Sequence, residues 1–459
     1  MKVVGLITEY NPFHNGHKYH IEEARRVTGA DYCIAVMSGS FVQRGAPAII
    51  DKYSRARMAL LNGVDLVLEL PVCFSTASAE YFAHGAVSLL DKLGVVDFIC
   101  FGSECGNISI LNKAAELLLD KSGLFDEYLQ AYLKEGKTYP AARSAAMQKV
   151  VMANQAMDIS DIDAELICQI INEPNNILGI EYIKAIRRLN SRVKPVTIQR
   201  ISAHYHAREL ADEKANASAK GDIIGTDLPT TNISSPAISS ATAIRNSILS
   251  ICQSDDNIIC HTATDISFNR IKSSVPDNVY QILRERYFKS FPITEEDFAQ
   301  LLHYRLIYED RQSLSEYMDV SEDLADRIKN MRDLNCGFEE FCKTVKSKNY
   351  TLTRINRALL HIVLNIRKSS VEAYCQEGYA QYARILGIKK ESSQLLRLID
   401  KKGALPVITK LSKADNMLDL PGRQMLTEDI SATHLYNRIV YGKYSFDIPN
   451  EYKHGICIV

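Results

Sequence analysis

Residues 6–24, LITEYNPFHNGHKYHIEEA, hold the turn on which the predicted fold depends. An apolar run ends at an Asn-Pro pair, and three histidines follow around one glycine: His14, His17 and His20. Proline ends a strand because it lacks a backbone N–H, whereas the glycine lets a ligand come close to the backbone. The stretch therefore predicts a strand, a tight turn and a helix with His17 in its first turn.

Strand and helix signals alternate outward from this turn over residues 1–102. The expected strands are residues 2–7, 31–37, 65–70 and 95–102, and the expected helices are residues 17–28, 51–63 and 76–94. The strands are apolar throughout, as in parallel sheets that helices cover on both faces. Since βαβ crossovers are right-handed, the pattern predicts a Rossmann-like α/β domain with a doubly wound parallel sheet.

The rest of the chain is predicted to be mainly helical. The expected elements are helices over 108–190, one of them starting after Pro174, a strand at 193–201, a loop at 203–236 and a helix starting near 238–248. Amphipathic helix predominates after residue 255. We therefore expect an α/β domain at 1–254 and an α-helical C-terminal domain at 255–459.

Composition narrows the class of protein. Of the 459 residues, 46% are hydrophobic and 24% charged, which is ordinary for a soluble globular protein. The net charge of −1 gives no global nucleic-acid signature, so any such surface must be local. We find neither a signal peptide nor an apolar run long enough to span a membrane. The 11 cysteines form no CxxC pair, which indicates reduced thiols in the cytoplasm and no structural zinc site.

The three histidines allow three interpretations. Ligands of open parallel sheets bind at the carboxyl ends of strands, and helix amino termini favour anions, so His14 and His17 suit a polyphosphate. A zinc site is the second interpretation, but such sites usually have HExxH or a comparable spacing on a helix. Alternatively, the histidines only cap or solvate a helix end. We prefer phosphate binding, in which His20 either takes part or simply continues the same helix face.

Two motifs resemble the nucleotidyltransferase superfamily. HNGH at 14–17 matches its HxGH motif, and ISSATAIRNSI at 238–248 resembles its ISSTxIR signature. Compared with the ISSTxIR signature, the segment at 238–248 carries one inserted residue, Ala241. The insertion leaves open the roles of Ser239, Ser240 and Thr242. Arg245 remains a candidate phosphate ligand, although the segment taken alone also fits an ordinary capped helix.

Longer motifs give a closer resemblance. These are EYNPFHNGHKYH, MSGSFVQRGAPAIIDKYSRARMALLNGVDLVLELPV, FGSE, EPNNILGIEYIKAI and SSATAIR, followed more weakly by TLTRINRALLHIVLNI and YARILGI. Together they resemble the bacterial tRNA(Met) cytidine acetate ligase family. The resemblance implies that ATP and acetate form acetyl-adenylate, and that the acetyl group passes to the wobble cytidine of elongator tRNA(Met) to give N4-acetylcytidine. The alternatives are a small-molecule adenylyltransferase of the same superfamily and a non-catalytic RNA- or nucleotide-binding protein.

The same resemblance implies the site residues. His14 and His17 are the expected catalytic residues, because activation of acetate needs in-line positioning and charge neutralisation. The implied ATP-binding residues are Ile7, Thr8, Glu9, Tyr10, Asn11, Pro12, Phe13, His14, Asn15, Gly16, His17, Lys18, Tyr19, His20, Gly102, Asn175, Arg200, Ile201 and Arg245. Asn176 is an alternative to Asn175. ATP is the expected substrate, with Mg²⁺, and we expect no tightly bound metal or organic cofactor.

A polar loop after the second strand offers further candidates. It contains Gln43, Arg44, Asp51 and Lys52. Arg44 or Lys52 would meet acetate or phosphate, while Asp51 would cap the next helix. We expect a direct role for at least one of the four.

A basic stretch in the C-terminal half predicts a tRNA surface. Residues 341–371 contain no acidic residue and the following basic ones: Lys343, Lys346, Lys348, Arg354, Arg357, Arg367 and Lys368. A second cluster comprises Lys389, Lys390, Arg397, Lys401 and Lys402. Such side chains bind the phosphate backbone without reading sequence. The anticodon base would be unstacked against an aromatic or Arg plane. The sequence does not indicate the oligomeric state.

Overall fold

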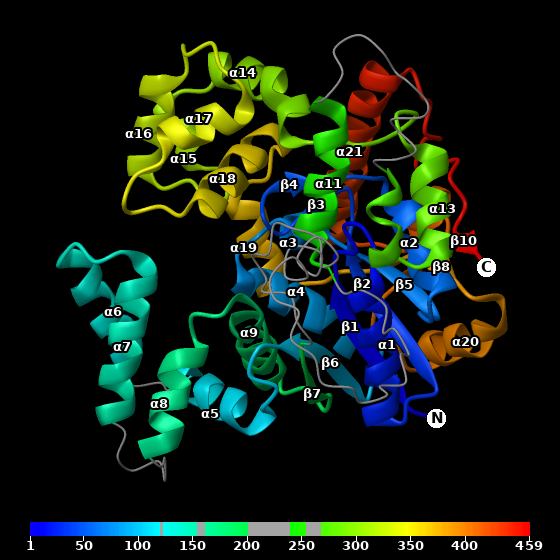
Figure 1. Ribbon diagram of the computed structural model, residues 1–459, viewed down its shortest axis with the longest axis horizontal. Helices are drawn as coiled ribbons and strands as arrows, with labels where there is room; N and C mark the ends of the chain where they lie inside the picture. Colours follow the sequence, from blue (N-terminus) through cyan, green and yellow to red (C-terminus); the bar gives the residue numbers. More distant parts are fainter. Residues whose placement is uncertain (120–122, 154–160, 201–238, 254–267) are drawn as a thin grey trace, which may run out of the picture.

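The computed structural model describes residues 1–119, 123–153, 161–200, 239–253 and 268–459. An eight-stranded sheet lies at the centre of these residues, in the order β10-β8-β5-β2-β1-β6-β7 with β9 beside β8 (Figure 1). Its strands are β1 (Val3–Thr8), β2 (Tyr32–Ser38), β5 (Leu66–Leu70), β6 (Phe98–Ser103), β7 (Lys194–Gln199), β8 (Ala383–Ile388), β9 (Val407–Ile408) and β10 (Cys457–Ile458). A separate hairpin consists of β3 (Phe41–Val42) and β4 (Ala46–Pro47).

The sheet is mixed but mostly parallel. Neighbouring strands from β5 to β7 are parallel, whereas β8 runs antiparallel to β5. The strand order reverses at β1, because β2 lies on one side of it and β6 on the other. In open α/β sheets such a reversal opens a crevice at the carboxyl ends of the two strands. The expected ligand position is therefore the end of β1, where the HNGH turn begins.

Helices surround the sheet on both faces. In the N-terminal half they are α1 (Asn15–Thr28), α2 (Lys52–Leu61), α3 (Val72–Ser75), α4 (Ala79–Lys92), α5 (Ile108–Leu119), α6 (Leu124–Lys134), α7 (Tyr139–Ala153), α8 (Asp161–Ile170), α9 (Pro174–Arg188) and α11 (Ala241–Gln253). In the C-terminal half they are η1 (Lys272–Ser274), α13 (Asp277–Arg286), η2 (Glu295–Phe298), α14 (Ala299–Tyr308), α15 (Arg311–Ser315), α16 (Glu322–Met331), α17 (Phe338–Val345), α18 (Leu352–Leu364), α19 (Lys368–Gln376), η3 (Lys390–Ser392), α20 (Ser393–Lys402), η4 (Leu411–Asn416) and α21 (Leu420–Tyr444).

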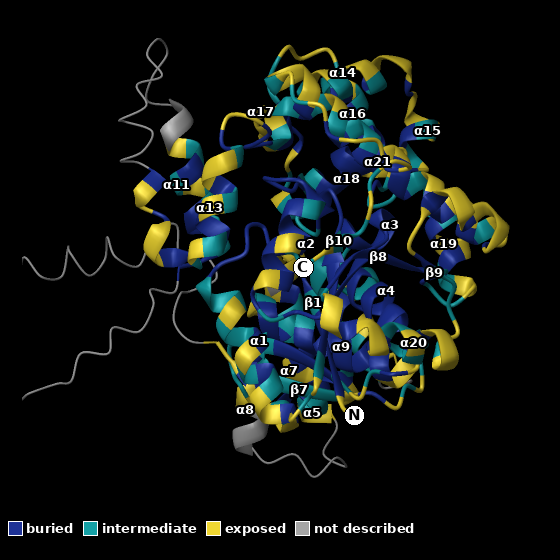
Figure 2. Cartoon of the chain, turned by 90° about the vertical axis from the view of Figure 1, so that its right-hand side faces the viewer, coloured by how far each residue is buried: buried dark blue, intermediate teal, exposed yellow. Residues whose placement is uncertain are grey.

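Alternation along the strands divides the core into two layers. In β2, Ile34 and Val36 belong to one hydrophobic cluster, and Cys33 and Ala35 belong to the other. This follows from the two-residue period of a strand, which points successive side chains to opposite faces. The first cluster takes in α4, α5, α9 and the helices from α14 to α21, whereas the second takes in α1, α2, α11 and α13. Figure 2 shows the strands as the most buried part of the molecule.

Most predicted elements are confirmed. The strands and helices of residues 1–102 appear in the predicted order, the helix after Pro174 is α9, and the strand at 193–201 is β7. The α/β fold with a largely helical C-terminal region is therefore correct. The loop predicted at 203–236 lies outside the described residues.

The structure differs from the prediction in two details of the sheet. The C-terminal half is not helical throughout, because β8, β9 and β10 join the sheet. All six residues of β8 are buried, and a short apolar run of this kind has no periodicity that separates strand from helix. The sheet is also not purely parallel, since β8 opposes β5. The helix expected over 76–94 is α4, and the short helix α3 precedes it. The boundary predicted at 254/255 falls outside the described residues, so the division into domains stays a prediction.

None of the helices in the described part of the chain combines the length and the apolar character needed to cross a membrane.

Candidate active site

A cleft of about 240 Å³ opens at the carboxyl ends of β1, β6 and β7, where the strand order reverses. Its walls come from these strands, the HNGH turn, the β3–β4 hairpin, α4, α9 and the start of α11. The lining residues are Ile7, Thr8, Glu9, Tyr10, Asn11, His14, Gly16, His17, Tyr19, His20, Gln43, Phe82, Phe101, Gly102, Asn175, Leu178, Tyr182, Ile198, Gln199, Arg200, Ser239, Ser240, Ala241 and Thr242. Segments far apart in the sequence thus meet at the predicted place.

The chain turns sharply between β1 and α1. Tyr10 adopts a φ of 48°, in the left-handed region that bulky residues rarely enter. The turn packs the His17 ring against Tyr10 and Phe13, with ring centroids 4.9 and 5.5 Å away. The rings of His14 and His17 stack with centroids 3.7 Å apart. The two motif histidines are therefore held in fixed orientations by aromatic packing.

Hydrogen bonds to the backbone fix which nitrogen of each ring carries the proton. His14 is the N-cap of α1, and its Nδ1 accepts from the backbone N–H of Gly16 at 3.1 Å. The Nδ1 atom of His17 accepts from the backbone N–H of His14 at 3.3 Å. A neutral imidazole with an accepting Nδ1 is protonated at Nε2. Each ring therefore has an Nε2–H as its remaining donor.

The environment keeps these histidines neutral. Burial, followed by the positive charges of Arg200 and Arg245, lowers the pKa of His14 to about 3. Burial and the neighbouring His14 lower the pKa of His17 well below its usual value. Burial and Arg200 lower the pKa of His20 to about 4. The site thus offers neutral imidazole donors beside the positive end of the α1 dipole, which together favour phosphate oxygens.

A carboxylate holds the opposite wall of the cleft. Glu104 accepts from the backbone N–H of Asn175 at 3.2 Å, from its side-chain amide at 2.6 Å and from the N–H of Asn176 at 2.8 Å. Glu104 thereby caps α9 and leaves the Asn175 Oδ1 to accept from Arg200 at 3.2 Å. Asn175 lines the cleft, whereas the Asn176 side chain turns back to the N–H of Cys105. Of the two candidate asparagines, Asn175 is therefore the one that lines the cleft.

Gly102 lies between these groups at the end of β6. A Cβ atom there would come within 3.2 Å of the Arg200 Cγ. A larger residue would therefore displace the arginine that lines the cleft.

The start of α11 closes another side of the cleft. Ser239, Ser240 and Thr242 line it together with the inserted Ala241. Arg245 does not line the cleft, and instead donates to the carbonyl of Asn11 at 2.8 Å and to Thr242 Oγ1 at 3.1 Å. Arg245 thus connects the turn before HNGH to the start of α11 from outside the cleft.

Some predicted ATP-binding residues lie outside the cleft. Pro12 and Phe13 are buried behind the turn, Lys18 is exposed, and the Asn15 side chain donates to the carbonyl of Ser273. Ile201 is not among the described residues. The remaining members of the predicted set, apart from Arg245, line the cleft.

The loop between β2 and α2 supplies one lining residue, Gln43. Asp51 caps α2, as expected, by accepting from the N–H of Ser54 at 2.9 Å. Lys52 is 1% exposed and paired with Glu69 and Glu451, each at 2.8 Å. Of the two alternatives for meeting acetate or phosphate, Arg44 and Lys52, the structure excludes Lys52, because it is buried and paired with these two carboxylates.

Several residues of the site were not predicted individually. The apolar wall consists of Phe82, Phe101, Leu178, Tyr182 and Ile198, next to Gln199. Their signal in the sequence is only that of core residues, so no motif separates them from the interior. Glu104 is the last residue of the FGSE motif, but the sequence did not predict that it would bind the start of α9.

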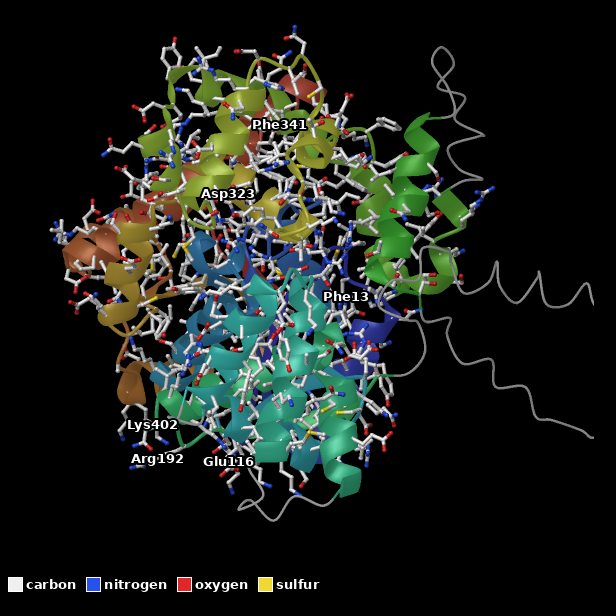
Figure 3. All side chains as sticks on the ribbon, turned by 90° about the vertical axis from the view of Figure 1, so that its left-hand side faces the viewer. Phe13, Glu116, Arg192, Asp323, Phe341 and Lys402 are labelled. Carbon is white, nitrogen blue, oxygen red and sulfur yellow. The ribbon has the colours of Figure 1, made fainter. Side chains whose placement is uncertain are left out.

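The structure separates the predicted tRNA-contacting residues into two groups. Lys343, Lys346 and Lys348 are exposed, and we call them the exposed lysine group. Lys343 forms a surface ion pair with Glu339 at 2.7 Å, which contributes little to stability. The group follows Phe341, which Figure 3 labels among the upper helices near Asp323.

The other predicted contacts are engaged within the protein. Arg357 is 8% exposed and paired with Asp319 at 2.7 Å, so the prediction that it binds RNA phosphate is wrong. Arg367 stacks over the Tyr317 ring at 3.8 Å, and Lys368 donates to two backbone carbonyls. Arg354 lies over the Tyr350 ring at 5.1 Å. These side chains hold the helices together, which charge counting in a sequence does not reveal.

The second basic cluster lies away from the cleft. Ile388 pairs with Leu66 at the amino end of β5, so Lys389 and Lys390 emerge at the opposite edge of the sheet. Lys402 lines a hollow at this edge together with Arg192, and Figure 3 shows both at the same corner.

No group of three or more His, Cys, Asp and Glu side chains within the described ranges is arranged to hold a metal ion.

The chain is similar to known proteins over nearly all its length. A family profile described as HIGH Nucleotidyl Transferase matches residues 1–221 and 224–449. A protein of Acetivibrio thermocellus named tRNA(Met) cytidine acetate ligase is 38% identical, over 95% of this chain and 94% of its own length. A protein of the same name from Alkaliphilus metalliredigens is 37% identical, over 95% and 94% of the two chains.

Solved structures share the whole fold. The crystal structure of Thermotoga maritima TmcAL bound with alpha-thio ATP matches with a TM-score of 0.82 and 30% identity, covering 100% of both chains. The apo structure of that protein matches with a TM-score of 0.84 and 30% identity, again over 100% of both chains. The similarity therefore includes the strands and helices of the C-terminal half.

Proposed function

The chain belongs to the HIGH nucleotidyltransferase family, among the tRNA(Met) cytidine acetate ligases, and we propose that it catalyses their ATP-dependent reaction. Acetate attacks the α-phosphate of ATP, which gives acetyl-adenylate and pyrophosphate. The exocyclic amine of the wobble cytidine of elongator tRNA(Met) then takes the acetyl group. The products are N4-acetylcytidine and AMP.

The observation that carries this proposal is the composition of the cleft. Two neutral imidazoles, the first turn of α1 and Arg200 converge where the strand order reverses. Such donors stabilise negative charge on phosphate oxygens without acting as nucleophiles. The relatives that are 37–38% identical carry the name of a ligase that uses acetate, which matches a cleft built for charge neutralisation.

The first step follows from these donors. Acetate is a poor electrophile, and joining it to AMP supplies a good leaving group. The reaction needs acetate and the α-phosphate held in line, with the developing charge spread over fixed donors. His14 and His17 supply Nε2–H donors to the phosphates, Arg200 supplies positive charge, and Gly102 leaves room for the nucleotide.

The remaining parts of the proposal concern partners. ATP acts as its Mg²⁺ complex, and acetate and elongator tRNA(Met) are the other substrates. The exposed lysine group contacts tRNA phosphates, within a tRNA-binding region at 255–459 that serves a catalytic region at 1–254. A cytoplasmic location, where tRNA is modified, stays a prediction.

Incubation with radiolabelled acetate, MgATP and total bacterial tRNA tests the proposal. We expect label in the anticodon cytidine of elongator tRNA(Met), together with acetate-dependent exchange between ATP and pyrophosphate in the absence of tRNA. A small-molecule adenylyltransferase would show neither result. Protein that binds ATP but gives no exchange and no label would overturn the proposal.

A further inference from the structure

Glu9 is the one carboxylate among the described residues that line the cleft. It lies directly after β1, and one of its side-chain oxygens accepts from the backbone N–H of Gln43 at 2.9 Å. Its second side-chain oxygen makes no hydrogen bond with the described part of the protein. A carboxylate is an unfavourable neighbour for ATP and acetate, which are both anions. Contact with the phosphates or acetate therefore does not explain the side chain of Glu9, which is among the implied ATP-binding residues.

Glu9 is held rigidly in place from behind. The buried guanidinium of Arg55 donates to the carbonyl of Glu9 at 2.7 Å and to that of Ser38 at 3.0 Å. The same side chain donates to the carbonyl of Ile50 at 3.1 Å. Arg55 thus fixes the end of β1 against the loop that leads into the β3–β4 hairpin. Reacting groups held this way need no reorganisation at the moment of reaction.

The wall next to Glu9 suits a flat base. The Gln43 side chain donates to the carbonyl of Ala77, just before α4 begins. From α4 the Phe82 ring lines the cleft, together with Phe101 and Tyr182, whose ring centroids are 5.5 Å apart. Aromatic rings of this kind stack on unpaired bases, and carboxylates accept hydrogen bonds from the cytosine amine. The amine acceptor and this aromatic wall, whose rings are 3–5% exposed, thus line the same cleft.

From this arrangement, which rests on the proposed function, we infer that Glu9 receives the exocyclic amine of the target cytidine and takes its proton during acetyl transfer. The amine nitrogen attacks the acetyl carbon of acetyl-adenylate, and a C–N bond forms. The bond between that carbon and the phosphate oxygen breaks, and AMP leaves with the electron pair. One N–H proton passes to the Glu9 carboxylate, which later releases it to water.

The variant Glu9→Gln separates the proposed proton transfer from the structural hydrogen bond to Gln43. The amide oxygen of glutamine still accepts from the Gln43 N–H, so the hairpin stays anchored, but the amide cannot take a proton. We expect acetate-dependent pyrophosphate exchange to fall far less than acetyl transfer, because the carboxylate takes no proton in the first step. The single-turnover transfer of acetyl from preformed acetyl-adenylate to tRNA should fall about 10²-fold or more. Glu22→Gln, on the exposed side of α1, is the matched control and should change neither rate.

Two outcomes would overturn the inference while leaving the proposed function intact. If Glu9→Gln transfers acetyl at the wild-type rate, Glu9 takes no proton from the amine. If the variant loses exchange, or its KM for ATP rises tenfold, Glu9 serves the first step or the adenine amine instead. By contrast, a wild-type protein that neither exchanges pyrophosphate nor labels tRNA would count against the proposed function itself.

Discussion

The two motif histidines each use one ring nitrogen to hold their own backbone. Their spacing predicts that both face the cleft, since His14 precedes α1 and His17 lies in its first turn. It does not predict the protonated nitrogen, because that depends on which backbone N–H each ring meets. Glu104 is a similar case, since it meets Asn175 from 71 positions away in the chain. Motifs thus identify residues that face a ligand more readily than those that hold them.

Glu104→Gln tests this supporting role. The change removes the charge that accepts three N–H groups at the start of α9, so Asn175 loses the orientation in which it meets Arg200. Hydrogen bonds to charged groups contribute about 1.5–3 kcal/mol, so we expect the KM for ATP to rise about tenfold or more, with a smaller effect on kcat. ATP–pyrophosphate exchange measures both. Glu173→Gln, exposed at the N-cap of the same helix, is the control and should leave KM unchanged.

The pKa of His14 makes the stability of the protein depend on pH. Its pKa is near 6.5 in the unfolded chain and, through burial and the charges of Arg200 and Arg245, about 3 in the folded protein. Above pH 6.5 both states are neutral. Between pH 6.5 and 3 only the unfolded chain binds the proton, so the free energy of unfolding falls, by about 2 kcal/mol at pH 5 from this residue.

His14→Asn provides the comparison, because asparagine can cap α1 but does not titrate. Calorimetry at pH 7 and pH 5 should show a smaller drop in Tm for this variant than for the wild type. Equal drops would mean that His14 takes a proton in the folded protein near pH 6.5 and is not the neutral donor described above.

At the scale of elements, the β3–β4 hairpin links the cleft to the C-terminal helices. Gly45 in its turn has a φ of 78°, and a Cβ there would lie 2.4 Å from the backbone nitrogen of Arg357 in α18. The same hairpin carries Gln43 to the cleft. The position of α18 therefore fixes the position of a cleft wall.

Gly45→Ala should separate these two elements. The left-handed backbone costs an L-residue about 1–2 kcal/mol, and the clash with α18 adds to it, so we expect a loss of about 2 kcal/mol or more in stability. Gly442→Ala in α21, where a Cβ meets nothing within 4 Å, should be neutral or stabilising. Thermal unfolding measures both variants. If Gly45→Ala lowers the thermal stability no more than Gly442→Ala does, the hairpin can move away from α18 at no cost, and the proposed coupling is wrong.

Elements were predictable where local signals and packing agree. The strand, turn and helix at residues 3–28 have an apolar run, a Pro break and capping histidines, and all three occur. The strand β8 has no such local signal, because its neighbours in the sheet come from residues 66–69 and 457–458. The apolar side of the cleft escaped prediction for the same reason. Phe82 and Tyr182 look like core residues until α4 and α9 are packed together.

At the scale of the whole molecule, a buried charge cluster joins the beginning of the chain to its end. Lys52 from α2 and Glu69 from β5 meet Arg384 from β8 and Glu451 from the C-terminal segment, and each is at most 3% exposed. The Lys52 ammonium lies 2.8 Å from both Glu69 and Glu451, and Arg384 pairs with the same two carboxylates. Burial raises the pKa of the Glu451 carboxyl, but the two cations outweigh burial and lower it below its usual range.

Because two cations share two carboxylates, removing one charge leaves the others unbalanced in the interior. We expect Glu451→Leu alone and Lys52→Met alone each to cost about 3–5 kcal/mol. The double variant removes one charge of each sign and leaves Arg384 paired with Glu69, so it should cost clearly less than the sum of the two single changes. Urea denaturation of the full chain measures all three variants.

An exposed pair of the same residue types supplies the control for this cycle. Lys137 and Glu135 lie 3.0 Å apart, with side chains that are 39% and 57% exposed. Lys137→Met and Glu135→Leu should each change stability by less than about 1 kcal/mol, because solvent screens such pairs. Additive costs at Lys52 and Glu451 would show that each charge is stabilised separately. Costs well below the sum would mean that charge balance holds the C-terminal segment to the N-terminal half, so that the sheet and the end of the chain form one cooperative unit.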